Sequence, residues 1–421
     1  MCKYVIEGAH RLYGSAEIHG AKNSALPILA ASIVCKGMNV IHNCPELSDI
    51  DATVNILRHL GCTVRRENDT VTVDSSVITQ NGIPDDLMRE MRSSVIFLGA
   101  ILSRTGEVTL STPGGCEIGL RPIDIHLDGI EKLGAEVLSE YGLVKCRTNG
   151  RLHGTKINLS FPSVGATENI MIAAATADGV TVITNAAREP EISDLADFLN
   201  RGGARIAGAG ESTIVIEGVR ELTGAEHTVI PDRIVAASYL AAAACTGGSV
   251  ELSNVIPAHL EPVLNVFEES GCRVDVNGRK LVLNAPNRLK NVKMIRTMPY
   301  PGFPTDIQAP VASMLTLARG TSLIVETIFE SRYKYIGELV RFGAKINVDG
   351  RMAVIEGVPS LHGASVVSPD LRGGMALIIA GLAAEGTTVV EDDGHIDRGY
   401  EFPERVLSKL NAKIKRTDQD D

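Results

Sequence analysis

The stretch PDRIVAASYLAAAACTGGSVELSN, residues 231–254, decides the fold because its parts recur along the chain. It joins a proline-led helical segment of small apolar residues to a glycine turn and an alternating strand. Proline suits the first position of a helix, glycine suits its end, and alternation of apolar and polar residues indicates a half-buried strand. Matching apolar segments occur at residues 20–32, 91–102, 162–175, 304–318 and 369–384. The chain therefore contains six copies of one unit.

A second marker recurs in phase with the first. A Gly-Ala or Gly-Cys pair, in one copy Asn-Ala, opens an alternating strand, and successive copies start 68 to 73 residues apart, at Gly61, Gly134, Gly203, Gly271, Gly343 and Asn411. Amphipathic segments such as residues 124–135 and 191–204 lead into these pairs. Each unit is thus predicted to contain a helix, a strand, a second helix and further strands.

The two helix types predict the architecture. Helices that are apolar on nearly every face are buried, whereas one-sided helices face solvent. We predict an α/β fold of two lobes, each an inside-out barrel with buried helices inside, sheet around them and amphipathic helices covering the faces. The first lobe takes residues 21–229; the second takes residues 1–20 and 230–421, and the strand KYVIEG at residues 3–8 completes its sheet. A cleft between the lobes is the predicted ligand site.

Composition excludes several classes of function. Aromatic residues are only 4% of the 421 residues and Trp is absent, which argues against nucleic-acid platforms that stack bases on exposed rings. A net charge of −10 makes nucleic acid and anionic membranes poor partners. No apolar run is long enough for a membrane span, and MCKYVIEGAH lacks the apolar core of a signal peptide. The eight cysteines show no zinc-site spacing, so we predict a cytoplasmic protein with reduced thiols and no metal.

Two segments carry candidate chemistry. Lys22 and Asn23 open the first buried helix, where free backbone N–H groups favour an anion; a solvated lysine at an ordinary helix start is the alternative. Residues 111–126, STPGGCEIGLRPIDIH, predict a mobile glycine-rich loop whose Cys116 delivers a proton. Arg121 and His126 are close enough in sequence to shift the pKa of the thiol. An inert surface thiol is the alternative for Cys116.

Charged or hydroxyl residues also lie near the starts of the other buried helices. They are Arg92, Ser163, Asp232, Arg233, Asp306, Asp370 and Arg372, while Arg332 and Arg398 follow strands. Each is open to interpretation as a helix cap or a structural ion pair, Asp232 and Asp370 above all. The repeated placement, however, predicts several anion-binding groups around one cleft, and hence a phosphorylated, carboxylated substrate.

In these segments the chain resembles a known family, the UDP-N-acetylglucosamine 1-carboxyvinyltransferases (MurA), which are enolpyruvyl transferases. The similarity runs from about residue 12 to residue 401 and is carried by residues 20–32, 113–137, 162–171, 185–192, 301–310, 326–332 and 370–390. The Gly-Gly-Cys loop and the Arg-Pro-Ile-Asp-Ile-His segment are specific to this family. The enolpyruvylshikimate-phosphate synthases share the inside-out barrel but lack this loop.

The resemblance implies transfer of the enolpyruvyl group of phosphoenolpyruvate to the 3-hydroxyl of UDP-N-acetylglucosamine, with release of phosphate. This is the first committed step of peptidoglycan synthesis, in the cytoplasm. No cofactor, metal, nucleic acid, membrane or obligate protein partner is implied. Fosfomycin, which alkylates the loop cysteine of this family, is expected to react with Cys116.

The resemblance also implies roles for individual residues. Cys116 is the general acid, Asp306 is the base for the 3-hydroxyl, and Lys22 with Arg398 completes the catalytic set. The substrate-binding residues are Lys22, Asn23, Arg92, Arg121, Pro122, Ile123, Asp124, Ile125, Ser163, Val164, Gly165, Asp306, Ile328, Arg332, Arg372 and Arg398.

One position departs from the family pattern. Some members carry a basic residue two positions before Ser163, where this chain has Phe161. Nucleotide contacts at this loop are therefore expected to come from backbone N–H groups. Two alternatives stay open: a 3-phosphoshikimate enolpyruvyl transferase on the same fold, and a non-catalytic nucleotide-sugar sensor. The joint presence of Lys22, Cys116, Asp306 and Arg398 argues against the sensor.

Overall fold

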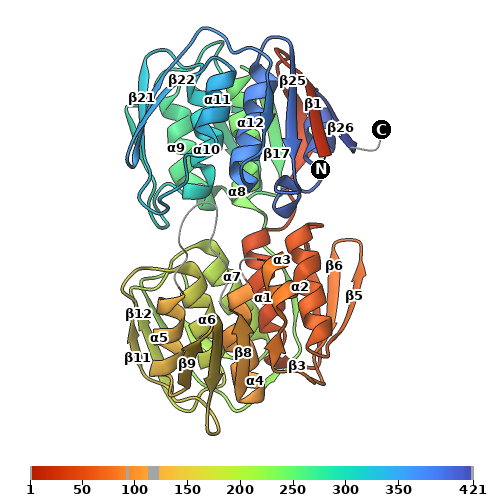
Figure 1. Ribbon diagram of the computed structural model, residues 1–421, viewed down its shortest axis with the longest axis vertical. Helices are drawn as coiled ribbons and strands as arrows, with labels where there is room; N and C mark the ends of the chain where they lie inside the picture. The colour runs from red at the N-terminus through yellow and green to blue at the C-terminus, as the bar shows by residue number, and fades with distance from the viewer. Residues whose placement is uncertain (1, 92–93, 112–122, 419–421) are drawn as a thin grey trace. The chain divides into compact units, whose positions relative to one another are not determined.

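The computed structural model describes residues 2–91, 94–111 and 123–418 (Figure 1). These residues form two compact units. The N-terminal unit contains the described part of residues 20–230, and the C-terminal unit contains residues 2–19 and 231–418. Within the described residues, no helix has both the length and the apolar character needed to cross a membrane.

Three four-stranded sheets of the N-terminal unit share one pairing pattern. Each begins with a parallel pair and continues with two antiparallel pairs. In order, they are β16 (Glu226–Thr228), β4 (Met38–His42), β6 (Thr70–Asp74) and β5 (Thr63–Glu67); β7 (Gly82–Ile83), β8 (Glu107–Ser111), β10 (Leu143–Arg147) and β9 (Glu136–Glu140); and β11 (Lys156–Asn158), β12 (Val180–Thr184), β14 (Thr213–Glu217) and β13 (Arg205–Ala207). A small parallel pair joins β15 (Leu222–Thr223) to β3 (Cys35–Lys36).

The C-terminal unit repeats this pattern in three further sheets. They are β2 (Tyr13–Glu17), β17 (Ser249–Ser253), β19 (Lys280–Asn284) and β18 (Arg273–Asn277); β20 (Met294–Arg296), β21 (Thr321–Val325), β23 (Met352–Glu356) and β22 (Lys345–Asp349); and β24 (Ser365–Val367), β25 (Thr387–Asp392), β1 (Cys2–Glu7) and β26 (Lys413–Asp418). The first strand of the chain lies between two of the last, which confirms the expected place of KYVIEG (Figure 1).

The small-residue helices form the centre of each unit, as predicted. They are α1 (Lys22–Ala31), α4 (Phe97–Thr105) and α6 (Val164–Ala174) in one unit, and α8 (Arg233–Cys245), α10 (Gln308–Leu315) and α12 (Leu371–Ala383) in the other. The short helical turns η1 (Ser94–Ile96) and η3 (Thr305–Ile307) precede α4 and α10. Small side chains allow close approach: a Cβ on Gly99 of α4 would lie 2.4 Å from the carbonyl oxygen of Asn169 in α6.

The position of the amphipathic helices differs from the expected layering. In the N-terminal unit α2 and α7 contact the central helix α1, and α5 contacts α6, instead of lying only against the sheets; in the C-terminal unit α9 and α13 contact the edge strands β18 and β26. Strands such as β14 alternate buried and exposed residues, so the outer face of the sheet is itself polar enough to meet solvent. The outer helices are α2 (Ser48–His59), α3 (Asp85–Glu90), α5 (Asp124–Lys132), α7 (Pro190–Arg201), α9 (Glu261–Glu269), α11 (Ile336–Arg341) and α13 (Pro403–Lys409), with the turns η2 (Pro257–His259) and η4 (Ile396–Arg398).

Candidate active site

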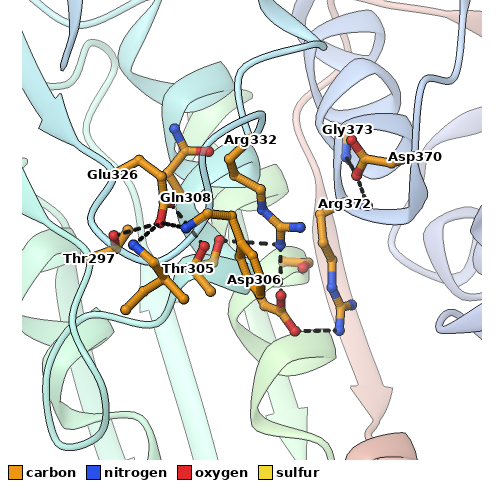
Figure 2. Close-up of polar contacts among 12 residues, drawn as sticks. Thr297, Thr305, Asp306, Gln308, Glu326, Arg332, Asp370, Arg372 and Gly373 are labelled. Carbon is orange, nitrogen blue, oxygen red and sulfur yellow. Dashed lines mark hydrogen bonds and ion pairs between the residues drawn. The ribbon is translucent and has the colours of Figure 1, made fainter. Parts of the chain in front are cut away.

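Three of the predicted charged residues come together in the C-terminal unit (Figure 2). Asp306 lies in η3, directly before α10. Its Oδ1 is 2.6 Å from Nη2 of Arg332, and its Oδ2 is 3.2 Å from Nη2 of Arg372. Both arginines are 3% exposed. Two buried guanidinium groups therefore share one carboxylate, which leaves the cluster with a net positive charge.

Some donors of this cluster have no protein acceptor. Arg332 Nε, Arg372 Nη1 and Gln308 Nε2 are buried and make no hydrogen bond within the described residues. Buried polar atoms in folded proteins nearly always have a partner, so each such atom needs an explanation. The arginines belong to the Asp306 cluster and Gln308 begins α10, two residues after that carboxylate. Donors of this kind are suited to the oxygens of a bound anion.

Aromatic rings support both guanidinium groups. Arg372 lies 5.4 Å from the centre of the Tyr400 ring, and Arg332 lies 5.7 Å from the centre of the Phe329 ring. The Tyr400 hydroxyl is 2.8 Å from Ser238 Oγ in α8. Burial alone would lower the pKa of Arg372, but the charge of Asp306 and, less strongly, the phenol of Tyr400 raise it above its ordinary value. Arg372 is therefore a permanent cation.

Helix capping fixes the backbone beneath Arg372. Asp370 Oδ1 accepts hydrogen bonds from the N–H groups of Arg372 at 2.9 Å and Gly373 at 3.0 Å. Asp232 caps α8 in the same way, through the N–H groups of Ile234 and Val235. The alternative interpretation of these two aspartates as helix caps is therefore confirmed. Such a cap is worth about 1 kcal/mol.

Glu326 organises the loop that precedes Arg332, and sequence reasoning missed it. Its side chain is 1% exposed. Oε1 accepts hydrogen bonds from the N–H groups of Ile328 at 2.8 Å and Phe329 at 3.1 Å, and Oε2 accepts one from the Thr305 hydroxyl at 2.9 Å. It thereby fixes the predicted contact residue Ile328 and the residue before Asp306. The sequence signal was a glutamate directly after β21, a strand that alternates buried and more exposed residues.

Arg398 lies in η4, close to the start of α12. Atoms of Ile396 approach Gly374 in α12, and the side chain of Leu371 approaches Gly399. Arg398 is half-buried. The structure thus places Arg398 on a turn that packs against the same helical turn that carries Arg372.

In the N-terminal unit, Lys22 begins α1 and is paired. Its Nζ lies 3.0 Å from Asp49 Oδ2 in the first turn of α2, and both side chains are almost fully buried. Asn23 is half-buried beside it. The next residue, Ser24, donates its hydroxyl hydrogen bond to the buried Asp194 of α7. The solvated-lysine alternative is therefore wrong, and the partner Asp49 could not be identified from sequence because an acidic residue early in a helix usually serves the helix itself.

The predicted nucleotide-sugar segments lie beside each other. Ser163 caps α6 by accepting a hydrogen bond from Ala166 N at 3.3 Å, and Val164 and Gly165 form the first turn. Ile123, Asp124 and Ile125 lie at the start of α5, which packs against α6. A Cβ on Gly165 would be 3.0 Å from Cε1 of His126, so this glycine permits the close approach of the two helices.

His126 in α5 is buried against Asn169 of α6. Its Nδ1 is 2.7 Å from Asn169 Nδ2, and burial lowers its pKa to about 4, against a weaker opposing effect of Asp124. The imidazole is therefore neutral at pH 7. A neutral imidazole supplies no positive charge. The expected influence of His126 on the pKa of the Cys116 thiol stays a prediction, because Cys116 lies outside the described residues.

Four predicted residues, Arg92, Cys116, Arg121 and Pro122, lie outside the described residues. The seven cysteines within the described part of the chain are buried and free of disulfides. Burial raises the pKa of Cys62 and Cys146 to about 11, which is consistent with inert structural thiols. Across the described ranges, no group of three or more His, Cys, Asp or Glu residues is placed to hold a metal ion.

Comparison with known proteins identifies relatives along the whole chain. The family model described as EPSP synthase (3-phosphoshikimate 1-carboxyvinyltransferase) matches residues 6–407. UDP-N-acetylglucosamine 1-carboxyvinyltransferase 2 of Caldanaerobacter subterraneus subsp. tengcongensis is 54% identical over 99% of this chain and 100% of its own length. The UDP-N-acetylglucosamine 1-carboxyvinyltransferase of Actinobacillus succinogenes is 47% identical over 99% of each chain.

Solved structures share the fold. The enolpyruvyl transferase NikO from Streptomyces tendae superposes with a TM-score of 0.89 at 26% identity, covering 99% of each chain. An EPSP synthase from Acinetobacter baumannii superposes with a TM-score of 0.72 at 19% identity, covering 99% of this chain and 100% of the other. The predicted α/β architecture is thereby confirmed.

Proposed function

Because the chain belongs to the EPSP synthase family of enolpyruvyl transferases, and within it matches UDP-N-acetylglucosamine 1-carboxyvinyltransferases at 47–54% identity over nearly its full length, we propose the reaction of those relatives for it. The enolpyruvyl group of phosphoenolpyruvate is transferred to the 3-hydroxyl of UDP-N-acetylglucosamine, and phosphate leaves. The product is a precursor of peptidoglycan.

The observation that carries this proposal is the buried pair of arginines around Asp306. A substrate with both a phosphate and a carboxylate needs several cationic donors, and the cluster offers Arg332 Nε and Arg372 Nη1 without protein acceptors in the described chain. The attacking hydroxyl loses its proton next to the bound phosphoenolpyruvate, so the base that takes this proton must lie close to the cations that bind that anion. Asp306 is such a group, 27% exposed at its side chain and therefore accessible to a substrate.

The first half of the reaction is an addition. The 3-hydroxyl oxygen forms a bond to C2 of phosphoenolpyruvate, and its proton passes to the Asp306 carboxylate. The electron pair of the C2–C3 double bond takes a proton at C3, for which Cys116 is the proposed donor. The result is a tetrahedral intermediate that keeps both the phosphate and the carboxylate.

The second half is an elimination. C3 gives up a proton, for which the proposed acceptor is the Cys116 thiolate left by the addition, and the C2–C3 double bond forms again. The bond from C2 to the phosphate oxygen breaks, and its electron pair leaves with the phosphate. Arg372 and Arg398, with Lys22, are proposed to hold the phosphate and carboxylate, and Arg332 supports Asp306. Positively charged donors that are fixed before the reaction stabilise such an intermediate without reorganisation.

The remaining residues are proposed to hold the nucleotide sugar. They are Arg92, Arg121, Pro122, Ile123, Asp124, Ile125, Ser163, Val164, Gly165 and Ile328. Asn23, beside Lys22, is instead proposed to bind phosphoenolpyruvate. The hydroxyl of Ser163 already accepts a hydrogen bond from Ala166, so backbone N–H groups at the start of α6 are the expected donors to this part of the ligand.

The test is phosphate release from phosphoenolpyruvate with each of two acceptors. Release with UDP-N-acetylglucosamine and none with 3-phosphoshikimate is expected. The opposite pattern would identify the shikimate reaction that the family model names. Release with neither acceptor, from protein whose folding is verified by circular dichroism, would contradict enzymatic transfer and favour a nucleotide-sugar sensor.

A further inference from the structure

The turn η4, which carries Arg398, is tied to the C-terminal strand of the chain. Arg416 in β26 donates from Nη1 to Asp397 Oδ1 at 2.7 Å and from Nη2 to Asp397 Oδ2 at 2.6 Å. Both N–H···O contacts are short, and each joins a different nitrogen to a different oxygen, which is the bidentate arrangement of strong arginine–carboxylate pairs. Asp397 is the residue directly before Arg398.

This ion pair is less exposed to solvent than the ion pair that Lys413 of β26 forms with Glu7. The side chains of Arg416 and Asp397 are 26% and 30% exposed, whereas those of Lys413 and its partner Glu7 are 59% and 64% exposed. The guanidinium group of Arg416 also lies 5.7 Å from the centre of the buried Tyr4 ring in β1. Arg416 is therefore fixed by a ring on one strand and points its two donors at the turn.

The other end of the turn is fixed as well. Asp392 Oδ2 accepts a hydrogen bond from Ile396 N at 3.2 Å, and Tyr400 N donates to the carbonyl oxygen of Ile396 at 3.0 Å. Neither contact involves the Asp397 carboxylate. Among the described residues, Arg416 is the residue that forms an ion pair and hydrogen bonds with that carboxylate.

The position of this carboxylate matters because Arg398 is its neighbour in sequence. A carboxylate released from Arg416 is a strong acceptor for any nearby guanidinium group, and it repels an anionic substrate. With both oxygens held by Arg416, its charge is neutralised and its direction is fixed.

We infer that Arg416 and Asp397 form a positioning pair that holds the Arg398 turn and keeps the Asp397 carboxylate from competing with the anionic substrate for Arg398. The inference rests on the proposed function, in which Arg398 binds the phosphate or carboxylate of phosphoenolpyruvate. Neither member of the pair touches substrate; both act through Arg398.

The experiment compares a single with a double variant. Arg416→Met leaves the Asp397 carboxylate without its partner, and the KM for phosphoenolpyruvate should rise about tenfold, the equivalent of one lost charge-assisted hydrogen bond, with a much smaller change in kcat. Asp397→Asn/Arg416→Met removes the competing carboxylate too, and the KM should return most of the way to the wild-type value. Arg416→Lys, which keeps the charge without the bidentate geometry, should lie between.

Thermal unfolding separates this role from simple stabilisation. Both the single and the double variant lose the ion pair, so both should unfold at a lower temperature than the wild type. Recovery of KM in the double variant without recovery of stability is the signature expected of a positioning pair. Equal KM values in the single and the double variant would overturn the inference, as would a wild-type KM in Arg416→Met.

Two controls keep the inference distinct from the proposed function. Lys413→Met removes a cation and an ion pair from the same strand. Its partner Glu7 lies at the end of β1 far from the turn, so the KM of this variant for phosphoenolpyruvate should equal that of the wild type.

Arg398→Gln tests the premise that Arg398 binds the anionic substrate. If the wild type transfers the enolpyruvyl group but Arg398→Gln is fully active, the assigned role of Arg398 fails; if Arg398→Gln is impaired and Arg416→Met is not, only the positioning inference fails.

Discussion

Replacing Asp306 by asparagine separates two roles of its carboxylate, that of the proposed base and that of the ion-pair partner of two arginines. The carboxylate accepts from Arg332 at 2.6 Å and from Arg372 at 3.2 Å. The asparagine amide keeps one acceptor oxygen and turns an NH₂ group toward the other guanidinium. The change therefore removes one charge-assisted contact and places the NH₂ donor of the amide next to a guanidinium donor. This should lower the free energy of unfolding by about 1.5–3 kcal/mol. Because the side chain is 27% exposed, water compensates in part, so the lower end is expected.

The effect on turnover should be larger. A positioned general base contributes about 10²–10⁴ in rate, so kcat for Asp306→Asn should fall by about that factor. This corresponds to about 3–5 kcal/mol of barrier, more than the expected loss of stability. Phosphate release at saturating concentrations of both substrates gives kcat, and urea unfolding of the same preparation gives the stability change.

Asp275→Asn is the matched control. Asp275 accepts from Arg273 at 2.9 Å in the same unit, but both side chains are well exposed, and such surface pairs contribute about 0–1 kcal/mol. This variant should match the wild type in both measurements. If Asp306→Asn retains kcat within about tenfold of the wild type while losing stability, Asp306 anchors the arginines but is not the base. If its stability is unchanged, the ion pairs themselves contribute nothing.

Other outcomes follow from burial, packing and the loop cysteine. Folding lowers the pKa of His126 from 6.5 to about 4, so the unfolded chain binds more protons than the folded chain between these pH values. The wild type should therefore lose about 3 kcal/mol of unfolding free energy between pH 7 and pH 4 through this group, and His126→Gln should not. Urea unfolding of both proteins at the two pH values measures this difference. Gly99→Ala, which places a Cβ 2.4 Å from the backbone of α6, should destabilise the protein by about 1–3 kcal/mol in urea unfolding. Gly337→Ala in α11, where a Cβ meets nothing within 4 Å, should instead stabilise it by about 0.5–1 kcal/mol. Fosfomycin should add one adduct at Cys116, absent from Cys116→Ala; an intact-mass and peptide map showing the adduct on another cysteine would contradict this assignment.

The sequence predicts the fold well because the repeat is strong. Helices such as α8 are apolar all round, so only a central position satisfies them, and the alternation in strands such as β14 fixes which face is buried. The layer order of the outer helices was not predictable in the same way. The sequence of an amphipathic helix indicates that one face is buried, but it does not indicate whether a sheet or another helix covers that face.

The site divides along a similar line. Asp306 and Arg372 are 66 residues apart, and what relates them in sequence is their common place at the starts of two buried helices. That relation suggested a shared ligand but not a direct ion pair. The contacts of Asp49 with Lys22 and of Glu326 with Ile328 were missed because both carboxylates act across loops, where no sequence period relates the partners.

The distribution of charge explains how an acidic protein is suited to a doubly anionic substrate. The chain carries a net charge of −10, but charges exposed to salt solution are screened beyond about 8 Å at physiological ionic strength. Arg332 and Arg372 are 3% exposed, so their attraction for a nearby anion is screened far less than the repulsion from surface carboxylates. Asp306 reduces the cost of burying two guanidinium groups without neutralising both of them. The cluster therefore has a local positive charge, together with donors that have no acceptor in the described chain. The net charge of the whole chain gives no indication of this.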